Sequence, residues 1–523
     1  MDGFKDAETA EIGISSARAA SFVALTQGAA ILINGVTLIL VARLLGIQLY
    51  AAYTLAYGVL TLFSASGGFG VSQYLNKHIP QALARRKKEK LPEILGDSIF
   101  TAVVLLLALF IVGTLLSGLI SQYVFHSTEY VWLITVALMG MVTTGIVGVE
   151  YNALIGFRDG SGSAIEFTSS AACMSIASIT LVYLGFGAVG AMYGIVIGSL
   201  AGIVAGLVLL RKHARISVKV SGIAGRIKDL LSFSTPLMLA GLFPGLLPGF
   251  AVLLLGVFAS TEIVSSYGVA YRLGGIVLTV IGFVSAVSLQ MFSSAAEGKN
   301  ARNGIDKLYN YSIYFASLAI VPVTAYLFAL PGAFVSSVFP TYVSARLYIP
   351  ALTVAILLGI VWHYAVQAVT SMGDVKVVLK YSAIVSFLQL FLLIVLVPLF
   401  SAYGIIFGLY LFGSLANDLL YIRYMERKMH IKTKLGGSLK VGAAGVVLAA
   451  LLYALNFLPA SQTAQLAAGV VLVLAVYPIL LGVMGAVGRS ELQILRAVAK
   501  RIPTFGAVLS WFTVYVEYFV RRG

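Results

Sequence analysis

Hydrophobic residues run along this chain in windows long enough to cross a lipid bilayer, and short polar stretches separate them. A helix needs about 20 apolar residues to span the hydrocarbon core. Windows of that size predict fourteen spans, at residues 19–45, 49–75, 98–121, 130–155, 163–184, 187–210, 231–257, 263–290, 308–330, 348–370, 377–398, 402–422, 439–457 and 464–486. The pattern therefore predicts an all-α polytopic membrane protein, with a polar segment at 1–18 before the first span.

The positions of the basic residues orient these spans. If the N-terminus lies in the cytoplasm, 32 of the 35 lysines and arginines fall in segments expected inside, and Arg43, Arg272 and Arg346 are the exceptions. Positive charge stays on the cytoplasmic side during insertion. We therefore expect a multi-pass plasma-membrane protein with both termini in the cytoplasm. The net charge of +15 follows from this topology and does not indicate a nucleic-acid partner.

Composition excludes other classes of protein. Only 11% of the residues are charged, against about a quarter in soluble domains. Cys173 is the single cysteine, so the chain forms no internal disulfide, and the five histidines show no metal-ligand spacing. The segments expected outside are short, the longest being 331–347. Residues 489–523 alternate basic and apolar turns, which predicts an interfacial helix on the cytoplasmic surface.

Landmarks that recur 214 residues apart indicate an internal repeat. The motif YTLAY, from Tyr53 to Tyr57, recurs as YGVAY, from Tyr267 to Tyr271. The repeat predicts two six-helix lobes, at 19–211 and 231–425, with a basic linker at 212–230 and two added helices at 439–486. Six helices per lobe give both lobes the same orientation. Parallel repeats of this kind are typical of transporters, in which the substrate binds between the halves.

Three segments give the chain a resemblance to a known family. They are ARLLGIQLYAAYTLAYG (42–58), STEIVSSYGVAYRL (260–273) and VFPTYVSARLYIPALTVAIL (338–357). With the fourteen spans, they resemble polysaccharide flippases of the Wzx type, in the superfamily that also holds the MATE drug antiporters and the lipid II flippase. The resemblance implies two lobes around a central cationic cavity. It also implies that lipid-linked oligosaccharide, on a polyprenyl or dolichyl phosphate carrier, passes from the cytoplasmic to the outer leaflet.

Arg272 is the main candidate for substrate binding, because it interrupts an apolar span and its guanidinium is permanently charged. In a cavity it could bind two phosphate oxygens of a lipid pyrophosphate. The alternative is an ion pair with Glu262. We expect four further residues to line the cavity, although His363 would also suit core packing: Arg43, Tyr57, Tyr271 and His363.

Three carboxylates within the predicted spans are candidates for binding a coupling proton or sodium ion. An ionised group in a membrane span usually faces a cavity or a charged partner. The alternative is an ion pair with Arg158 or Arg423 near the helix ends, and for Asp418 this is the preferred interpretation. Glu150 and Glu166 lie deeper, both in the first half. Apart from such an ion, the sequence predicts no cofactor and no metal.

Glycines and prolines mark two further features. Glycines at spacing four, from Gly190 to Gly206, predict close packing along one face of the span at 187–210. In the span at 231–257, Pro244, Pro248 and Gly249 predict a bend or break, and Asn34-Gly35 occupies the equivalent place in the first span. The hypotheses for these four sites are a static kink and a hinge for transport.

The leading functional hypothesis is a flippase for lipid-linked oligosaccharide that acts by alternating access and is not an enzyme. Its alternative is a cation-coupled multidrug antiporter, against which Arg272 argues because a fixed cation repels cationic drugs. A second alternative is a polytopic oligosaccharide polymerase or ligase, which needs a larger outer loop than this chain offers. Expected partners are the lipid-linked oligosaccharide, membrane lipids, and glycosyltransferases or a polymerase of the same pathway. The expected state is a monomer.

Overall fold

The chain folds into helices throughout the part that the structure describes. The computed structural model describes the backbone of residues 2–67, 70–218, 222–296, 301–488, 491–493, 495–496 and 513–517. Within these residues the elements are α1 (Asp2–Gly67), α2 (Val71–Ala84), η1 (Lys88–Lys90), α3 (Leu91–Val124), α4 (Val131–Gly156), α5 (Gly160–Leu181), η2 (Val182–Phe186), α6 (Gly187–Leu210), α7 (Ile223–Phe258), α8 (Thr261–Ala296), α9 (Ala301–Ala329), α10 (Pro331–Val338), α11 (Ala345–Leu358), α12 (Ile360–Ser371), α13 (Val375–Phe400), α14 (Ala402–Ile405), η3 (Ile406–Leu411), α15 (Phe412–Arg427), α16 (Gly436–Ala454), η4 (Leu455–Phe457) and α17 (Gln462–Val483).

The expected membrane spans coincide with these helices. Among the described residues, 11 helical stretches are long and apolar enough to cross a bilayer. Gly160–Leu210 contains two expected spans, and Gly28–Ala65 overlaps two, at 19–45 and 49–75. α8 covers the remaining span at 263–290. Gly46, with φ 67°, is the non-helical residue inside α1 and lies where the first two spans were expected to separate. The fold class predicted from the sequence is therefore confirmed.

The described residues form two compact units, and each is considered by itself. Unit 2 consists of Thr26–Val269 and Lys376–Gly413. One of its cores gathers apolar side chains of α2, α3, α4 and α6, including Leu75, Ile79, Leu95 and Leu210, all fully buried. The short helix α2 packs against α3 and α4. The sequence did not predict α2 as a separate helix, because the apolar window at 49–75 runs across the break after Gly67.

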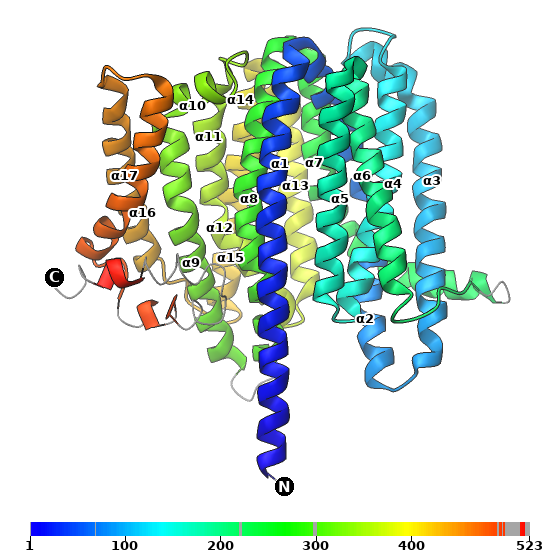
Figure 1. Cartoon of the computed structure of the whole chain (residues 1–523). Helices are drawn as coiled ribbons and strands as arrows, with labels where there is room; N and C mark the ends of the chain where they lie inside the picture. Colours follow the sequence, from blue (N-terminus) through cyan, green and yellow to red (C-terminus); the bar gives the residue numbers. More distant parts are fainter. Residues whose placement is uncertain are drawn as a thin grey trace. The chain divides into compact units, whose positions relative to one another are not determined.

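Unit 1 consists of Met1–Leu25, Ala270–Val375 and Ser414–Gly523. In its core, α9 packs against α16 and α17 (Figure 1). Tyr314 and Tyr477 donate their buried hydroxyls to the carbonyls of Ala486 and Leu318, at 2.9 and 3.0 Å. The two added helices are thus docked on α9. Most of the interfacial helix expected at 489–523 lies outside the described residues, but Leu492 and Val516 belong to this core.

The basic segments expected on one side of the membrane lie together in unit 2. Arg226 binds Asp97 with two nitrogens, Nε at 2.6 Å and Nη2 at 3.2 Å. Ser217 donates its backbone N–H to the carbonyl of Pro92, at 3.2 Å. The linker at 212–218 is therefore attached to the start of α3. This contact agrees with the expectation that segments 76–97 and 211–230 lie on the same side of the membrane.

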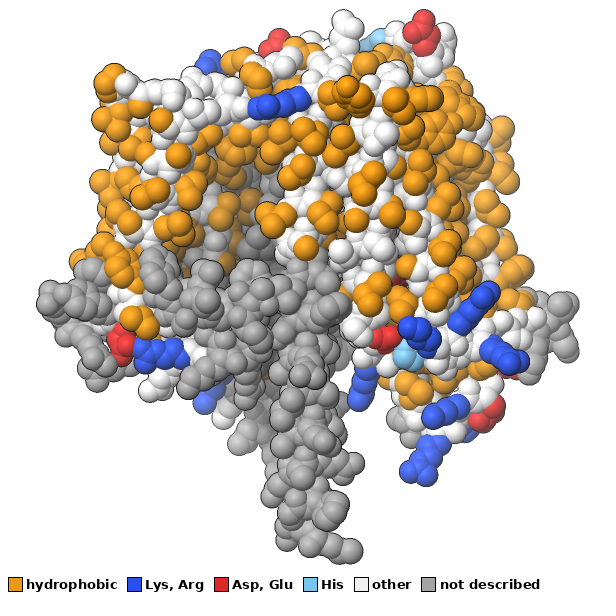
Figure 2. Space-filling model, in the orientation of Figure 1, with side chains coloured by type: hydrophobic (Ala, Val, Ile, Leu, Met, Phe, Trp, Pro, Cys, Tyr) orange, Lys and Arg blue, Asp and Glu red, His pale blue; other side chains and the backbone are white. Residues whose placement is uncertain are grey.

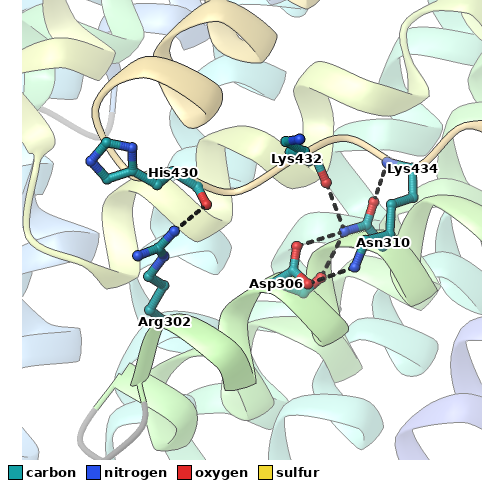
Figure 3. Close-up of polar contacts among 6 residues, drawn as sticks. All are labelled: Arg302, Asp306, Asn310, His430, Lys432 and Lys434. Carbon is teal, nitrogen blue, oxygen red and sulfur yellow. Dashed lines mark hydrogen bonds and ion pairs between the residues drawn. The ribbon is translucent and has the colours of Figure 1, made fainter.

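The same grouping occurs in unit 1, where α9 holds the segment between α15 and α16 (Figure 3). Asn310 donates from Nδ2 to the carbonyl of Lys432, at 3.1 Å, and accepts from the backbone N–H of Lys434, at 2.6 Å. Asp306 accepts from Nζ of Lys434, and Arg302 donates to the carbonyl of His430. Residues expected inside, at 291–307 and 423–440, thus meet at one end of unit 1.

Hydrophobic side chains cover the flanks of the helices on the face that Figure 2 shows. Large apolar residues on α3 are strongly exposed, among them Leu115 at 78% and Ile111 at 59%. The buried positions of α3 include small polar residues such as Ser117 and Ser121. Such an inside-out distribution places lipid, and not water, around the helices.

Cysteine labelling tests which side of the membrane each helix end occupies. In a Cys173→Ser background, we expect Lys88→Cys and Lys432→Cys to react only from the cytoplasm, because they lie in basic segments. Thr128→Cys and Ala460→Cys should react only from outside. An impermeant maleimide applied to intact cells and to inverted vesicles makes the measurement. Labelling of Lys88→Cys from outside would reverse the topology.

Candidate functional site

Two glutamates meet inside unit 2 at a glycine. Glu150 on α4 and Glu166 on α5 are both 0% exposed. A Cβ atom built on Gly206 of α6 would lie 2.5 Å from Oε2 of Glu150 and 2.8 Å from Oε1 of Glu166. Both carboxylates therefore point at one small space, which exists because residue 206 has no side chain. None of their four oxygens has a hydrogen-bond partner among the described residues.

The glycines of α6 lead to this point. Gly194, Gly198 and Gly202 pack against α5 at Ser178, Met174 and Ser170, in that order. The contacts advance by four residues on each helix, in opposite directions, and the next step brings Gly206 to Glu166. In lipid, small residues allow backbones to approach closely. The packing role expected for these glycines is observed, and it sets the register that joins the carboxylates.

A polar contact joins the start of α5 to the segment that follows α6. Asp159 caps α5, accepting from the N–H of Gly162 at 2.7 Å, and His213, just beyond α6, lies 2.8 Å from its other oxygen. The ring of Phe157 stacks on His213 at 4.9 Å between centroids. Burial would raise the pKa of Asp159, but hydrogen bonds from His213, Gly162 and Ser161 outweigh it and hold that pKa below its usual value.

Asp418 in unit 1 has a different environment. Its Oδ1 accepts a hydrogen bond from the backbone N–H of Trp362, at 2.7 Å, in the first turn of α12. The expected single span at 348–370 breaks at Gly359 into α11 and α12, and Ser414 donates to the carbonyl of Ala355 across the break. Asp418 therefore caps a helix that starts within the apolar stretch, instead of forming the ion pair with Arg423 that the sequence favoured.

The residues expected to line a cavity are distributed over both units. Arg43 is exposed and Tyr57 is half-buried, both on α1 within unit 2. Tyr271 and Arg272 are half-buried on α8, and His363 is half-buried on α12, all in unit 1. Their common role at one cavity stays a prediction. Directly after Arg272, α8 packs closely on α11, since a Cβ on Gly274 would meet Leu352 and Ile356 at 3.0 Å.

Two residues that the expected repeat makes equivalent lie in contact. Thr54 on α1 and Gly268 on α8 are 214 residues apart, the offset of that repeat, and both belong to unit 2. A Cβ on Gly268 would collide with the side chain of Thr54. The two helices therefore approach each other closely at this position, and the repeat itself stays a prediction. The sequence contained both residues but did not reveal their contact.

The proposed hinge residues lie on two uninterrupted helical stretches. α7 is continuous from Ile223 to Phe258, so Pro244 and Pro248 do not break it. Asn34 and Gly35 likewise lie in a helical part of α1. A Cβ on Gly249 would collide with the backbone N of Leu62 and lie 2.7 Å from the carbonyl oxygen of Gly58. Gly249 is therefore required for packing, while a hinge role for all five residues stays a prediction.

The molecule has the architecture of a polytopic membrane transporter, with many apolar helices and carboxylates buried among them. The sequence profile of the family described as "Polysaccharide biosynthesis protein" matches residues 16–296. The chain belongs to this family, the Wzx-type flippase family, and the resemblance stated above is confirmed. A search of curated protein sequences finds no match.

Solved structures share the fold. The lipid II flippase MurJ, in an inward closed conformation, superposes with a TM-score of 0.67 at 14% identity, over 88% of this chain and 98% of that chain. An inward-facing multidrug resistance MATE family transporter of the MOP superfamily gives 0.58 at 18%, over 78% and 98%. A MOP superfamily transporter from Pyrococcus furiosus, with a binding pocket of reverse polarity, gives 0.57 at 18%, over 80% and 95%. At these identities the likeness concerns the fold.

Substitutions in α7 separate packing from bending. We expect Gly249→Ala to destabilise the protein by about 1–3 kcal/mol, because its new methyl group collides with backbone atoms that cannot rotate away. Pro248→Ala restores a backbone donor inside the helix and should not lower the melting temperature. Gly241→Ala is the control, since its Cβ meets nothing within 4 Å. Thermal unfolding in detergent measures all three, and an unchanged melting temperature in Gly249→Ala would contradict the packing role.

Proposed function

We propose that this protein moves lipid-linked oligosaccharide from the cytoplasmic to the outer leaflet of the plasma membrane by alternating access. Its membership of the polysaccharide biosynthesis family supports a substrate of this class. The fold shared with the lipid II flippase supports transport of a large lipid-linked molecule. The carrier would be a polyprenyl or dolichyl phosphate, and the protein would act as a monomer with both termini in the cytoplasm. Glycosyltransferases or a polymerase would be its partners.

The observation that carries the proposal is the position of Arg272. α8 begins at Thr261, so Arg272 lies about 16 Å along the helix at 1.5 Å per residue. Facing lipid, a guanidinium at that depth costs at least about 2.5–3.5 kcal/mol on insertion scales. A hydrated cavity removes most of this cost. There the planar guanidinium can bind two oxygens of a lipid pyrophosphate, the charged group that a flippase must carry through an apolar environment.

The MATE-like fold is equally compatible with an antiporter of organic cations. A fixed arginine near the substrate would repel such cations, whereas it attracts a pyrophosphate. The family and fold are those of transporters, which favours transport over catalysis by a polymerase or ligase.

Flipping in proteoliposomes tests the proposal. The purified protein should flip a fluorescent polyprenyl-pyrophosphate oligosaccharide and should not accumulate a cationic dye. We expect Arg272→Ala to slow flipping roughly 10- to 100-fold, the loss of hydrogen bonds to a charged group. Arg272→Lys should recover part of the rate, since a point charge lacks the bidentate geometry.

Arg346→Ala is the matched control, because Arg346 is an exposed arginine that also lies outside the expected inner segments. It should flip at the wild-type rate. Normal flipping by a well-expressed Arg272→Ala would remove the phosphate role of Arg272. Dye transport without oligosaccharide flipping would favour the antiporter.

A further inference from the structure

The glutamate pair in unit 2 lies where three helices end. Glu150 precedes the end of α4 by six residues, Glu166 follows the start of α5 by six, and Gly206 precedes the end of α6 by four. At 1.5 Å per residue, each lies about 6–9 Å from these ends. Both side chains are wholly buried, and Gly206 leaves their oxygens facing one point.

Two ionised carboxylates are not stable in this place. Oε1 and Oε2 of both residues lack any donor among the described residues. Burying an ionised carboxylate without a partner is so costly that the group neutralises instead. Two carboxyl groups that share a site satisfy each other when one proton lies between them, since one then donates and the other accepts. A proton is thus the smallest ligand that fits.

A metal ion fits the pair poorly. Hard cations such as Ca²⁺ take six to eight oxygen ligands, and Mg²⁺ takes six. The described residues contain no group of three or more His, Cys, Asp or Glu side chains that could hold a metal. The three atoms nearest to a Cβ built on Gly206 all belong to the two carboxylates.

The surrounding helices supply no other charge to the pair. α4, α5 and α6 contain no Asp, Glu, Lys, Arg or His apart from Glu150 and Glu166. The charged groups of the connecting segments and of the packed helices α2 and α3 are partnered or lie towards the helix ends: Lys77 and His78 of α2, Glu93 and Asp97 of α3, Arg158 and Asp159 between α4 and α5, and Arg211, Lys212 and His213 after α6. Arg158 is exposed and donates to neither glutamate. On these helices Tyr74, Tyr151 and Tyr193 likewise donate to neither glutamate.

Asp418 provides an internal comparison. It is also a carboxylate inside an expected span, but it is half-buried and the N–H of Trp362 donates to it. Asp418 therefore has a donor within the protein. The Glu150–Glu166 pair has none among the described residues, and both side chains are wholly buried.

We propose that Glu150 and Glu166 form a proton-binding site in which one proton is shared between the two carboxylates, and that this proton drives transport. The second part rests on the function proposed above. When the helix ends held by Asp159 and His213 separate, water would reach the pair and the proton could leave. Because a ligand shifts an equilibrium by its differential affinity, proton binding would then favour the arrangement described here, in which the pair is buried.

Infrared spectroscopy tests the site without any transport assay. Purified protein in nanodiscs should show a carboxylic-acid band at neutral pH that is absent from Glu150→Gln and from Glu166→Gln, in which the amide donates in place of the proton. Gly206→Ala should shift the band in frequency, because its methyl group separates the carboxylates and breaks the hydrogen bond between them. Gly148→Ala, whose Cβ meets nothing within 4 Å, and Asp418→Asn should keep it. Absence of the band from the wild type would overturn the site.

Flipping under ion gradients tests the coupling. In wild-type proteoliposomes a pH gradient should change the flipping rate on the order of tenfold, within the usual range of coupling energies. A sodium gradient should have no effect. Both Glu→Gln variants should flip at one rate with or without the gradient. A response to sodium, or wild-type flipping that ignores the pH gradient, would overturn the coupling.

The two proposals fail in different ways. If the wild type shows the carboxylic-acid band but flips no lipid-linked oligosaccharide, the proposed function is wrong and the proton site stands. If it flips the oligosaccharide but lacks the band, the proton site is wrong and the function stands.

Discussion

The fold depends on how closely the helix backbones approach one another. Lipid surrounds apolar side chains as well as a protein core does, so helices in a membrane gain little by burying them. This chain instead uses residues without side chains: Gly249 rests on the backbone of α1, Gly404 on Leu396, and Gly445 on Val321. Each such contact fixes the rotation of a helix about its axis. That rotation decides which polar side chains meet.

The places of the membrane spans could be predicted from the sequence because the bilayer imposes a minimum length on every span. Charge placement predicted which helix ends lie together, and the contacts of Arg226 with Asp97 and of Asn310 with Lys432 agree. The break at Gly359 could not be predicted. It requires Asp418, on a helix more than 50 residues later, to supply the hydrogen bond that the interrupted helix needs. Local hydropathy contains no information about such a partner.

The candidate residues were recognisable individually, but not their groupings. Glu150 and Glu166 stand out as acids in apolar spans, yet their contact with one space depends on the register between α5 and α6. The spacing of the glycines in the sequence does not reveal that register. In α7 the prolines suggested bending, whereas the structure shows that the neighbouring Gly249 is needed for contact with α1. Composition identifies unusual residues, and packing determines what they do.

The contact between Thr54 and Gly268 has a consequence for how the two halves diverged. Under the repeat that the sequence predicts, an ancestor made of two identical copies would have placed this residue against its own duplicate. Two threonines cannot occupy the space, because even a single added carbon at residue 268 collides with Thr54. A symmetric ancestor would have needed glycine at both places. Threonine could then replace glycine in one half only. After that replacement the two halves were no longer interchangeable at this contact.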